Sequence, residues 1–244
     1  MLNYHDPTAL RVYTDHECFY SIAGQQYPAI NTVISATEAE QHKQHWAAWR
    51  AVPENALLSK QAHSRRRLLH SAIEHHFRRG SYELAFADKE QQAIVEVMPF
   101  WNSVQHVLPR ITNPILIESA VWHTIGRYAG TVDMVCHFND VPCILDWKIA
   151  KRNNQSYPRY NFAFQAAAYA GAINRMYRTS IHTGIVVVAL PEEEAHVLQF
   201  SLKSFWRPWV RRLLEYWQQQ DTPAAAETLG MLEEEYQLNA SRRE

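Results

Sequence analysis

Two aspartates and a lysine stand close together in the stretch from Gly130 to Lys148, which reads GTVDMVCHFNDVPCILDWK. Asp133 belongs to one apolar run, and Asp146 and Lys148 belong to the next. Carboxylate oxygens are the ligands that Mg²⁺ and Mn²⁺ prefer, and a lysine can orient a water or stabilise charge on phosphate oxygens. These residue types therefore suit metal-assisted hydrolysis of a phosphodiester, if the fold brings them together.

A β-hairpin would bring them together. The two apolar runs flank Asn139-Asp140, a pair that is typical of a two-residue hairpin turn. With this turn, Asp133 lies directly opposite Asp146, and Lys148 projects from the same face. Two facing carboxylates repel each other, so the hairpin predicts a metal ion between them. A turn longer by one residue would remove this direct opposition.

Two further residues are candidates for the same site. Glu118 is the only acid in the apolar strand expected at 114–123, and a carboxylate in such a strand needs a partner. His70 lies on a helix expected at 63–79, with Glu74 one turn later, and this pair could supply a metal ligand and its neighbour. A helical histidine followed by a glutamate is also common in purely structural roles, so both interpretations stay open.

Basic residues are unevenly distributed, although the formal net charge is only −1. No acid occurs from Trp147 to Pro191. The basic residues of this stretch are Lys148, Lys151, Arg152, Arg159, Arg175 and Arg178. A second basic cluster lies earlier in the chain and consists of Lys60, Arg65, Arg66, Arg67, Arg78 and Arg79. The asymmetry predicts a locally positive surface for phosphates, and Arg65, Arg66, Arg67, Lys151 and Arg152 are the residues expected to bind a DNA strand. Ordinary solvated helix faces are the alternative.

Composition limits the class of protein. A chain of 244 residues with 47% apolar content is sufficient for one domain with a sizeable core. The three cysteines form no CxxC pair, so neither a zinc site nor an iron-sulfur cluster is expected. We expect reduced thiols in a cytoplasmic protein. The sequence has no signal-like start and no apolar run long enough to span a bilayer, so we expect no membrane partner.

The expected elements form a mixed α/β fold. A helical N-terminal region, 1–110, contributes His70 and part of a channel over the site, 111–220 forms the core, and 221–244 is a peripheral tail, all within one compact domain. Expected strands are 10–13, 19–22, 114–123, 131–138, 141–147, 181–190 and 196–200, with a turn at 24–28. Expected helices are 36–50 with Ser35 as its cap, 63–79 ending at Gly80, 84–108 with a kink at Pro99, 162–177 and 202–219. The order of these elements indicates a mixed central sheet flanked by helices.

Two tryptophans of the first expected helix, Trp46 and Trp49, share one face. Indole rings at such positions can stack on nucleic-acid bases, but packing against a core or another helix is the more frequent role. The sequence favours packing.

The motifs around the hairpin resemble a known family. Gly130–Asp133 followed by Ile144–Lys148 is similar to the PD-(D/E)xK core of the restriction-endonuclease-like nuclease superfamily. His70 upstream, and Gln165 with Tyr169 downstream, match its RecB-type branch, in which a helical histidine joins the metal site and a QxxxY helix follows the lysine. Within this branch, the chain is most similar to a single-strand DNA exonuclease, in the segments GTVD, ILDWK and QAAAYAGAIN and in YPAINTVIS upstream.

The resemblance implies a restriction-endonuclease-like fold and a role for each matched position. Mg²⁺ or Mn²⁺ would be bound by His70, Asp133 and Asp146 with the carbonyl of Ile149, and Glu118 would lie beside the metal. Asp133, Asp146 and Lys148 would form the catalytic set, and Gln165 and Tyr169 would contact DNA or steady the site.

The implied activity is a metal-dependent deoxyribonuclease of replication, repair or recombination, most similar to an exonuclease on single-stranded ends. An endonuclease on the same core, or a non-catalytic DNA-binding subunit of a recombination complex, are the alternatives. The chain lacks the four cysteines of the iron-sulfur members of this branch. It also lacks an obvious organellar transit peptide, from which we expect a bacterial or viral setting.

Overall fold

The computed structural model describes residues 9–13, 18–151 and 159–241. Its elements in chain order are β1 (Ala9–Tyr13), β2 (Cys18–Ile22), β3 (Gln25–Pro28), α1 (Ile30–Ala36), α2 (Glu40–Arg50), α3 (Pro53–Arg79), η1 (Glu83–Phe86), α4 (Gln91–Val104), η2 (Leu108–Arg110), β4 (Ile111–His123), β5 (Tyr128–Phe138), β6 (Val141–Ile149), α5 (Arg159–Tyr177), β7 (Thr183–Ala189), β8 (His196–Ser201), α6 (Lys203–Gln218) and α7 (Pro223–Ser241).

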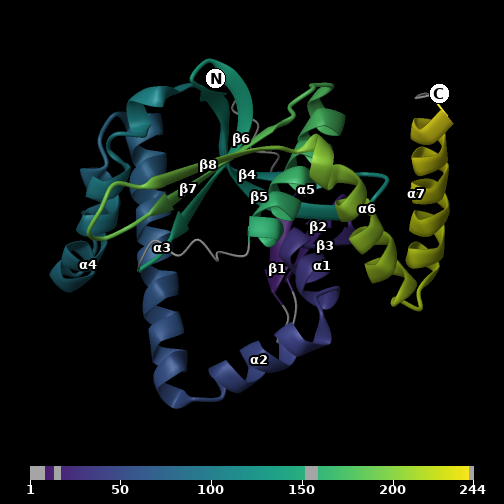
Figure 1. The fold of residues 1–244 in the computed structure, drawn as a ribbon, viewed down its shortest axis with the longest axis horizontal. Helices are drawn as coiled ribbons and strands as arrows, with labels where there is room; N and C mark the ends of the chain where they lie inside the picture. Colours follow the sequence, from purple (N-terminus) through teal and green to yellow (C-terminus); the bar gives the residue numbers. More distant parts are fainter. Residues whose placement is uncertain (1–8, 14–17, 152–158, 242–244) are drawn as a thin grey trace.

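A mixed five-stranded sheet forms the centre of the molecule, in the order β4-β5-β6-β7-β8. Strands β6 and β7 pair in parallel, and the other neighbours are antiparallel. Figure 1 shows α3 and α4 on one side of this sheet and α5, α6 and α7 on the other. The expected α/β class with a mixed sheet between helices is therefore confirmed. A separate antiparallel sheet, β1-β2-β3, precedes the helices of the N-terminal region.

The predicted hairpin turn is correct. Asn139 and Asp140 have φ angles of 47° and 65°, the left-handed pair that a tight two-residue turn requires. Phe138 therefore pairs with Val141, and the ladder keeps the predicted register as far as Met134 with Leu145. The expected direct pair of Asp133 with Asp146 is not part of the ladder, because β6 pairs with β7 from Cys143 onward and leaves β5 beyond Leu145.

Strands β5 and β6 separate just before the two aspartates. The pair farthest from the turn is Met134 with Leu145. Beyond this pair, β6 is bonded to β7 and β5 is bonded to β4, but β5 and β6 no longer pair with each other. On β4, Glu118 has a φ of 43°, which is rare for a residue with a side chain and marks a local distortion of the strand. The result is a fork between β5 and β6, and the acidic residues gather there.

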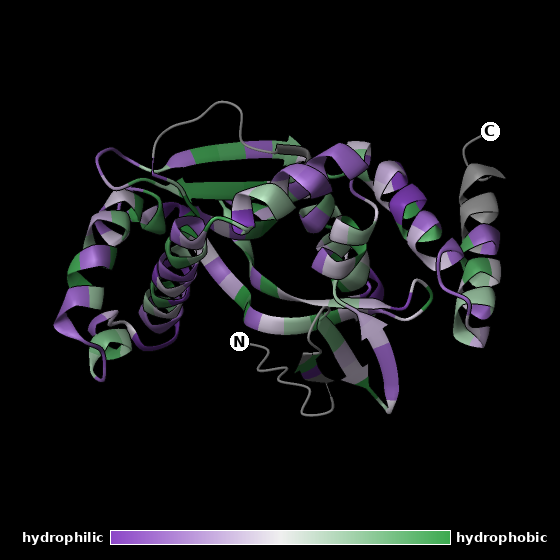
Figure 2. Cartoon of the chain, turned by 90° about the horizontal axis from the view of Figure 1, so that it is seen from below, coloured by the Kyte–Doolittle hydropathy of each residue, from purple (hydrophilic) through white to green (hydrophobic). Residues whose placement is uncertain are grey.

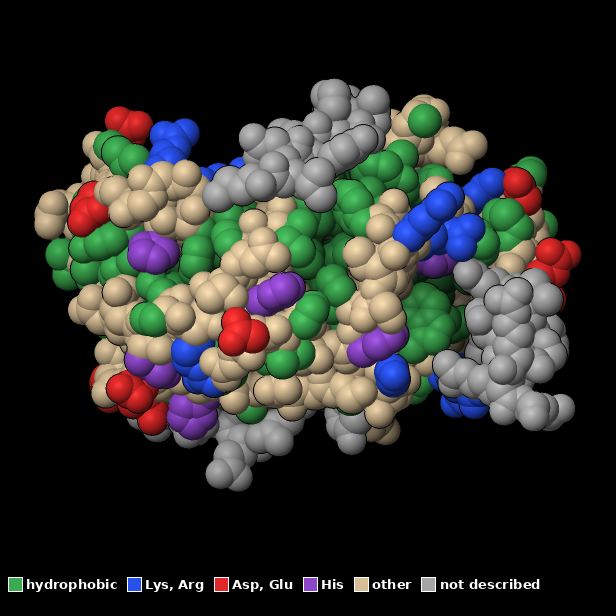
Figure 3. All heavy atoms as spheres, turned by 90° about the horizontal axis from the view of Figure 1, so that it is seen from above, with side chains coloured by type: hydrophobic (Ala, Val, Ile, Leu, Met, Phe, Trp, Pro, Cys, Tyr) green, Lys and Arg blue, Asp and Glu red, His purple; other side chains and the backbone are tan. Residues whose placement is uncertain are grey.

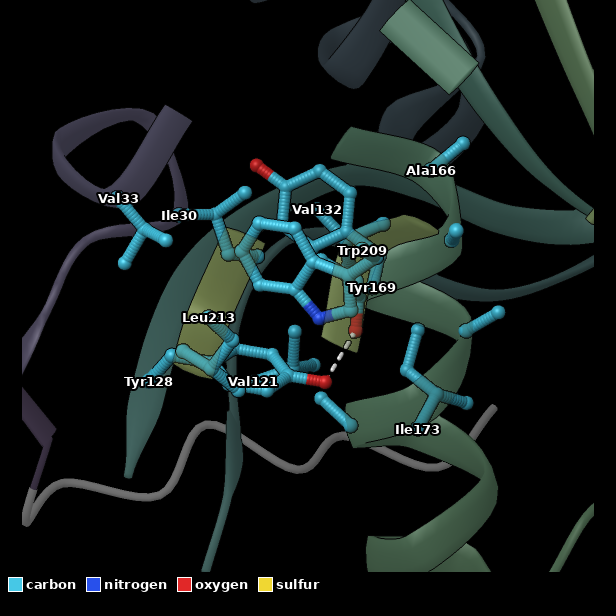
Figure 4. Close-up of a cluster of buried hydrophobic side chains, with 14 of the residues drawn as sticks. Ile30, Val33, Val121, Tyr128, Val132, Ala166, Tyr169, Ile173, Trp209 and Leu213 are labelled. Atoms are coloured by element: carbon cyan, nitrogen blue, oxygen red, sulfur yellow. Dashed lines mark hydrogen bonds between the residues drawn. The ribbon is translucent and has the colours of Figure 1, made fainter. Parts of the chain in front are cut away.

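One face of the sheet is covered by α5 and α6. Buried alanines of α5, including Ala166, allow this helix to lie close to the strands, as its small residues predict. Figure 4 shows Tyr128, Tyr169 and Trp209 packed together within this cluster. The Tyr128 hydroxyl donates to the carbonyl of Ala168 at 3.1 Å, which ties β5 to α5.

The other face is covered by α3 and α4. Leu69 and Ile73 of α3 are buried against Met134 and Leu145 of the hairpin and Trp101 of α4. Their spacing of four residues places them on one side of the helix. This anchoring turns His70, the residue next to Leu69, toward the fork. In Figure 2 hydrophobic residues dominate the central strands, while hydrophilic residues are more frequent along the surrounding helices.

The predicted start of the first helix is wrong. Ser35 does not cap a helix over 36–50 but lies inside α1, and α2 follows only at Glu40. Val33 and Ile34 are buried, so the earlier apolar residues form a helix of their own. The Thr37 side chain donates to the carbonyl of Val33 at 2.8 Å at the end of that helix.

The long helix α3 begins at Pro53, ten residues before the predicted start at His63. Proline suits the first turn of a helix. Leu57 and Leu58 of this added part are 59% and 40% exposed, so the part has no buried stripe whose period would reveal it. The predicted end is correct, because Gly80 closes the helix with a φ of 73°.

Other boundaries differ in smaller ways. The expected turn at 24–28 is instead strand β3, because Ala23 and Gly24 form a tight turn with φ angles of 50° and 79°. The segment 84–108 is divided among η1, α4 and the start of η2, and Pro99 lies within α4. The tail contains a regular helix, α7, packed beside α6.

Helix α2 and the first half of α3 form an arch that reaches away from the sheet (Figure 1). Trp46 of this arch is 47% exposed and makes an edge contact with Trp49, with ring centroids 5.6 Å apart. Trp46 therefore does not pack in a core, and its packing against another helix, the other expected role, stays a prediction. Among the described helices, none combines the length and the apolarity that a membrane span needs.

Candidate active site

Three potential metal ligands from three elements meet at the fork. His70 of α3, Glu118 of β4 and Asp133 of β5 each offer one ligand atom, and these atoms lie within 4.8 Å of one another. The His70 Nδ1 atom is 2.9 Å from Glu118 Oε1 and 3.6 Å from Asp133 Oδ1. The structure therefore brings Glu118 and His70 to Asp133, as the sequence predicts.

The main chain of Trp147 completes this group. Its N–H donates to Asp133 Oδ2 at 2.9 Å, and its carbonyl oxygen is 3.2 Å from His70 Nε2. Because the β5–β6 ladder has already ended, these two backbone groups are paired with side chains. The fork thus fixes the orientation of both Asp133 and His70.

The His70 ring carries an electrostatic environment that favours its protonated form. Burial lowers the pKa of His70. The charge of Asp133, together with the hydrogen bond and charge of Glu118, raises this pKa by more than burial lowers it, so the pKa lies above its ordinary value. A protonated ring can donate from Nδ1 to Glu118 and from Nε2 to the carbonyl of Trp147. In the absence of metal, the proton on His70 supplies the positive charge among the carboxylates.

Asp146 and Lys148 form a second group beside the first. Both side chains are largely buried, and Lys148 Nζ is 2.5 Å from Asp146 Oδ2. This contact is a close ion pair. Burial raises the pKa of Asp146, Lys148 opposes this effect, and the charge of Asp133 adds to it. The ammonium of Lys148 also lies 5.1 Å from the ring centroid of Phe162.

Helix α5 supplies the next contacts. Lys148 Nζ donates to Gln165 Oε1 at 3.2 Å, and the Tyr169 hydroxyl donates to the carbonyl of Thr131 at 2.7 Å. Burial and the nearby Asp133 charge raise the pKa of Tyr169 well above its ordinary value, so the hydroxyl remains a donor. Gly130 permits this approach, because a Cβ there would lie 2.7 Å from Tyr169 Cε1. Gln165 and Tyr169 therefore support the site from within the protein.

The donor set fits a hard divalent ion. One imidazole nitrogen and carboxylate oxygens are ligands that Mg²⁺ and Mn²⁺ accept, and opposite ligands of Mg²⁺ lie about 4.2 Å apart. The separation of up to 4.8 Å among the atoms of His70, Glu118 and Asp133 needs only a small contraction to reach this value. Asp146 lies outside this group of three, next to Lys148.

The backbone carbonyl at His70 is that of Trp147. The carbonyl of Ile149, which the resemblance implies as a metal ligand, stays a prediction. Ile149 ends β6 and lines a neighbouring cavity. Glu74 is likewise not the partner of His70, because it forms an ion pair with Arg78 at 2.9 Å. Sequence spacing along the helix left the pair of His70 and Glu74 open, whereas the carboxylate that contacts His70 is that of Glu118 on a distant strand.

The expected basic residues do not form one surface. Arg66 faces the site, with Nε 3.4 Å from His70 Nε2, whereas Arg65 forms an ion pair with Glu96 at 3.2 Å. Arg67 and Lys151 are exposed, and Lys151 lines a different cavity, shared with Arg65. Arg152 lies outside the described residues. On the face that Figure 3 shows, the described Lys and Arg side chains occur in separate small groups.

A cavity of about 490 Å³ opens beside Lys148. Residues from α1, α3, β6 and the start of α5 line it: Asn31, Ile34, Ser35, Glu38, Ser59, Ala62, His63, Arg66, Lys148, Ile149, Asn161, Phe162 and Gln165. Sequence reasoning assigned no function to Asn31 or Asn161, since a single polar residue on a helix carries no periodic signal. The cavity joins the arch to the group of Lys148 and Gln165.

This fold and site define a nuclease superfamily. Residues 33–229 match the sequence profile of the PD-(D/E)XK nuclease superfamily, and the chain belongs to that superfamily. The family resemblance inferred from the motifs is thereby confirmed.

Curated relatives carry one common name, mitochondrial genome maintenance exonuclease 1. The protein of Xenopus tropicalis is 37% identical over 125 residues, which cover 48% of this chain and 36% of the relative. The mouse protein is 32% identical over 133 residues, covering 52% and 39%, and the human protein is 31% identical over 122 residues, covering 47% and 36%. The matched part thus spans little more than a third of each relative.

Proposed function

We propose that this protein is a Mg²⁺- or Mn²⁺-dependent deoxyribonuclease that removes nucleotides from single-stranded DNA ends. The observation that carries the proposal is the meeting of His70, Glu118 and Asp133 within 4.8 Å, next to the buried pair Asp146 and Lys148. Membership of a nuclease superfamily supports it, as does the exonuclease name of the partly matching relatives.

Each residue has a definable part in hydrolysis. His70, Glu118 and Asp133 would hold the ion, and Asp146 would add a carboxylate on its Lys148 side. The carbonyl of Trp147 would accept from Nε2 of His70 and so fix the ring with Nδ1 toward the ion. The bound ion would polarise the phosphodiester and lower the pKa of a bound water. Lys148, held by Asp146 and Gln165, directs its ammonium to where charge develops on the phosphate oxygens.

The cavity and the arch support a single strand as the substrate. The cavity of about 490 Å³ lies in the size range of sites for small ligands, which suits an extended chain of nucleotides better than a duplex. Arg66 lines this cavity and lies close to the ligand group, so it is the basic residue placed to contact a phosphate near the cleavage point. Exposed Trp46 of the arch offers an aromatic face for a base.

Digestion of labelled DNA tests the proposal. Single-stranded DNA labelled at either end, duplex DNA and a covalently closed single-stranded circle are each incubated with Mg²⁺, Mn²⁺ or EDTA. We expect stepwise products from the linear single strand with either metal, none with EDTA, and an intact circle. Cleavage of the circle would show an endonuclease, and DNA binding without products under every metal would show a non-catalytic subunit.

Matched variants assign the activity to the fork. Glu118→Gln removes a negative charge from the ligand group. Glu74→Gln is the matched control, because it removes a negative charge from the ion pair with Arg78, one helical turn after His70 on α3. Glu118→Gln should weaken metal-dependent cleavage, and Glu74→Gln should retain it. Equal activity of the two variants would contradict the proposed ligand group.

A further inference from the structure

We propose that Asn31 is a positioning residue for Lys148 and acts through the side-chain amide of Gln165. This inference rests on the proposed function, because it concerns how the lysine is held for hydrolysis. Asn31 lies on α1, far from Lys148 in the sequence, within the stretch YPAINTVIS, to which the sequence analysis assigned no role.

The contacts form a continuous chain. Lys148 Nζ donates to Gln165 Oε1 at 3.2 Å, and Gln165 Nε2 donates to Asn31 Oδ1 at 3.1 Å. Gln165 is only 7% exposed, so its amide has little access to water as a substitute partner. The orientation of this amide therefore depends on the groups at its two ends.

The direction of each hydrogen bond is fixed by chemistry. A lysine ammonium has no acceptor, so Gln165 must present its oxygen to Lys148 and its nitrogen to the opposite side. That nitrogen needs an acceptor, and Asn31 Oδ1 supplies one at ordinary length. The Tyr169 hydroxyl is a weaker alternative, since it lies 3.5 Å from Gln165 Nε2. Without Asn31, the amide can rotate and turn its N–H groups toward the ammonium.

The position of α1 explains how an exposed residue can perform this role. Ile30 and Val33, on either side along the helix, are buried, so the backbone of Asn31 is fixed while its side chain lines the cavity. A strand lying in the cavity would exclude water from the hydrogen bond between Asn31 and Gln165 and thereby strengthen it. The effect of Asn31 is therefore expected in the chemical step more than in substrate binding.

Kinetics of three variants test the role. Asn31→Ala should lower kcat on labelled single-stranded DNA about tenfold, the rate equivalent of one hydrogen bond, with KM changed less than about threefold. Asn31→Asp keeps an acceptor oxygen and should recover most of kcat, although its added charge raises KM. Ser35→Ala is the control, because Ser35 lines the same cavity one helical turn later. A loss of kcat in Ser35→Ala equal to that in Asn31→Ala, or no recovery in Asn31→Asp, would overturn the proposal.

A double-mutant cycle tests whether the effect passes through Gln165. In a Gln165→Ala background, Asn31→Ala should cause no further loss of kcat, because the route to Lys148 is already broken. A full tenfold loss in that background would show that Asn31 acts on the substrate directly and would overturn the positioning role.

The side-chain amide resonances of Gln165 give a readout that needs no turnover. They should shift in Asn31→Ala and remain in place in Ser35→Ala, and the reverse pattern would overturn the arrangement. Failure of the wild-type protein to cleave DNA with any metal would overturn the proposed function and this role together. An active wild type with an equally active Asn31→Ala would overturn this role alone.

Discussion

Metal binding at the fork should release the proton of His70. In the metal-free protein, Asp133 and Glu118 raise the pKa of His70 above its ordinary value of about 6.5 despite burial. A metal needs the neutral imidazole, so the ion and the proton compete for the same ring. The prediction is that a divalent ion replaces this proton among the carboxylates.

The magnitude follows from the direction of the shift. At pH 6.5 more than half of the His70 rings are protonated without metal, so binding should release between about half a proton and one proton per ion. As the pH rises above the raised pKa of His70, the release should fall toward zero. Below the pKa of His70, the apparent affinity for Mn²⁺ should fall about tenfold for each pH unit.

The sign for protein stability is opposite to that for metal affinity. Because the folded-state pKa of His70 is raised, the metal-free protein gains stability from this proton below pH 6.5 and loses it as the pH rises through the raised pKa. The hydrogen bond of 2.9 Å to Glu118 involves charged groups, for which a contribution of about 1.5–3 kcal/mol is typical.

Calorimetric titration with Mn²⁺ measures the released proton when it is repeated in buffers of different ionisation enthalpy. His70→Gln should remove the release at pH 6.5, and Glu74→Gln should leave it unchanged. A wild-type protein that releases no proton, or a His70→Gln variant that releases as many as the wild type, would refute the assignment of His70 to the metal group.

Three other perturbations have defined outcomes. Burial lowers the pKa of His123 to about 3, so the free energy of unfolding in urea should fall by about 1.4 kcal/mol for each pH unit below 6.5. A His123→Gln variant whose free energy of unfolding falls equally with pH would exclude His123 as the cause. Gly130→Ala should lower stability by about 1–3 kcal/mol and reduce cleavage, because its Cβ would lie 2.7 Å from Tyr169, while Gly230→Ala, with open space around it, should cause no loss. Mn²⁺ at a hundredfold excess over its Kd should raise the melting temperature by about 5–10 °C through mass action, and an equal rise in Asp133→Asn would argue against the site.

The hairpin was predictable because its information is local. Alternating apolar residues and the Asn139-Asp140 turn determine its register as far as Met134 and Leu145, the last pair before the two aspartates. The fork after Met134 was not predictable in the same way. It depends on β6 pairing with β7, a partner from beyond α5, while β5 stays with β4.

The sequence analysis assigned His70 and Glu118 to one site but did not predict which groups His70 contacts directly. The partner of His70 is Glu118 and not the neighbouring Glu74, and the carbonyl at its Nε2 belongs to the main chain of Trp147, which leaves no mark on residue type. The first half of α3 is exposed and has no buried apolar residues at helical spacing, so the predicted helix began ten residues later than α3 does. Local patterns thus identified the acids and the lysine, and tertiary packing determined what each of them contacts.

The single-turnover rate of cleavage of an end-labelled single strand by Lys148→Gln, measured with saturating Mn²⁺, tests the central claim most directly. Lys148 is held between Asp146 and Gln165 at the fork, so its loss should slow cleavage at least about a hundredfold while Mn²⁺ and DNA still bind. Cleavage by Lys148→Gln at the wild-type rate would contradict the claim that this fork is the site of phosphodiester hydrolysis.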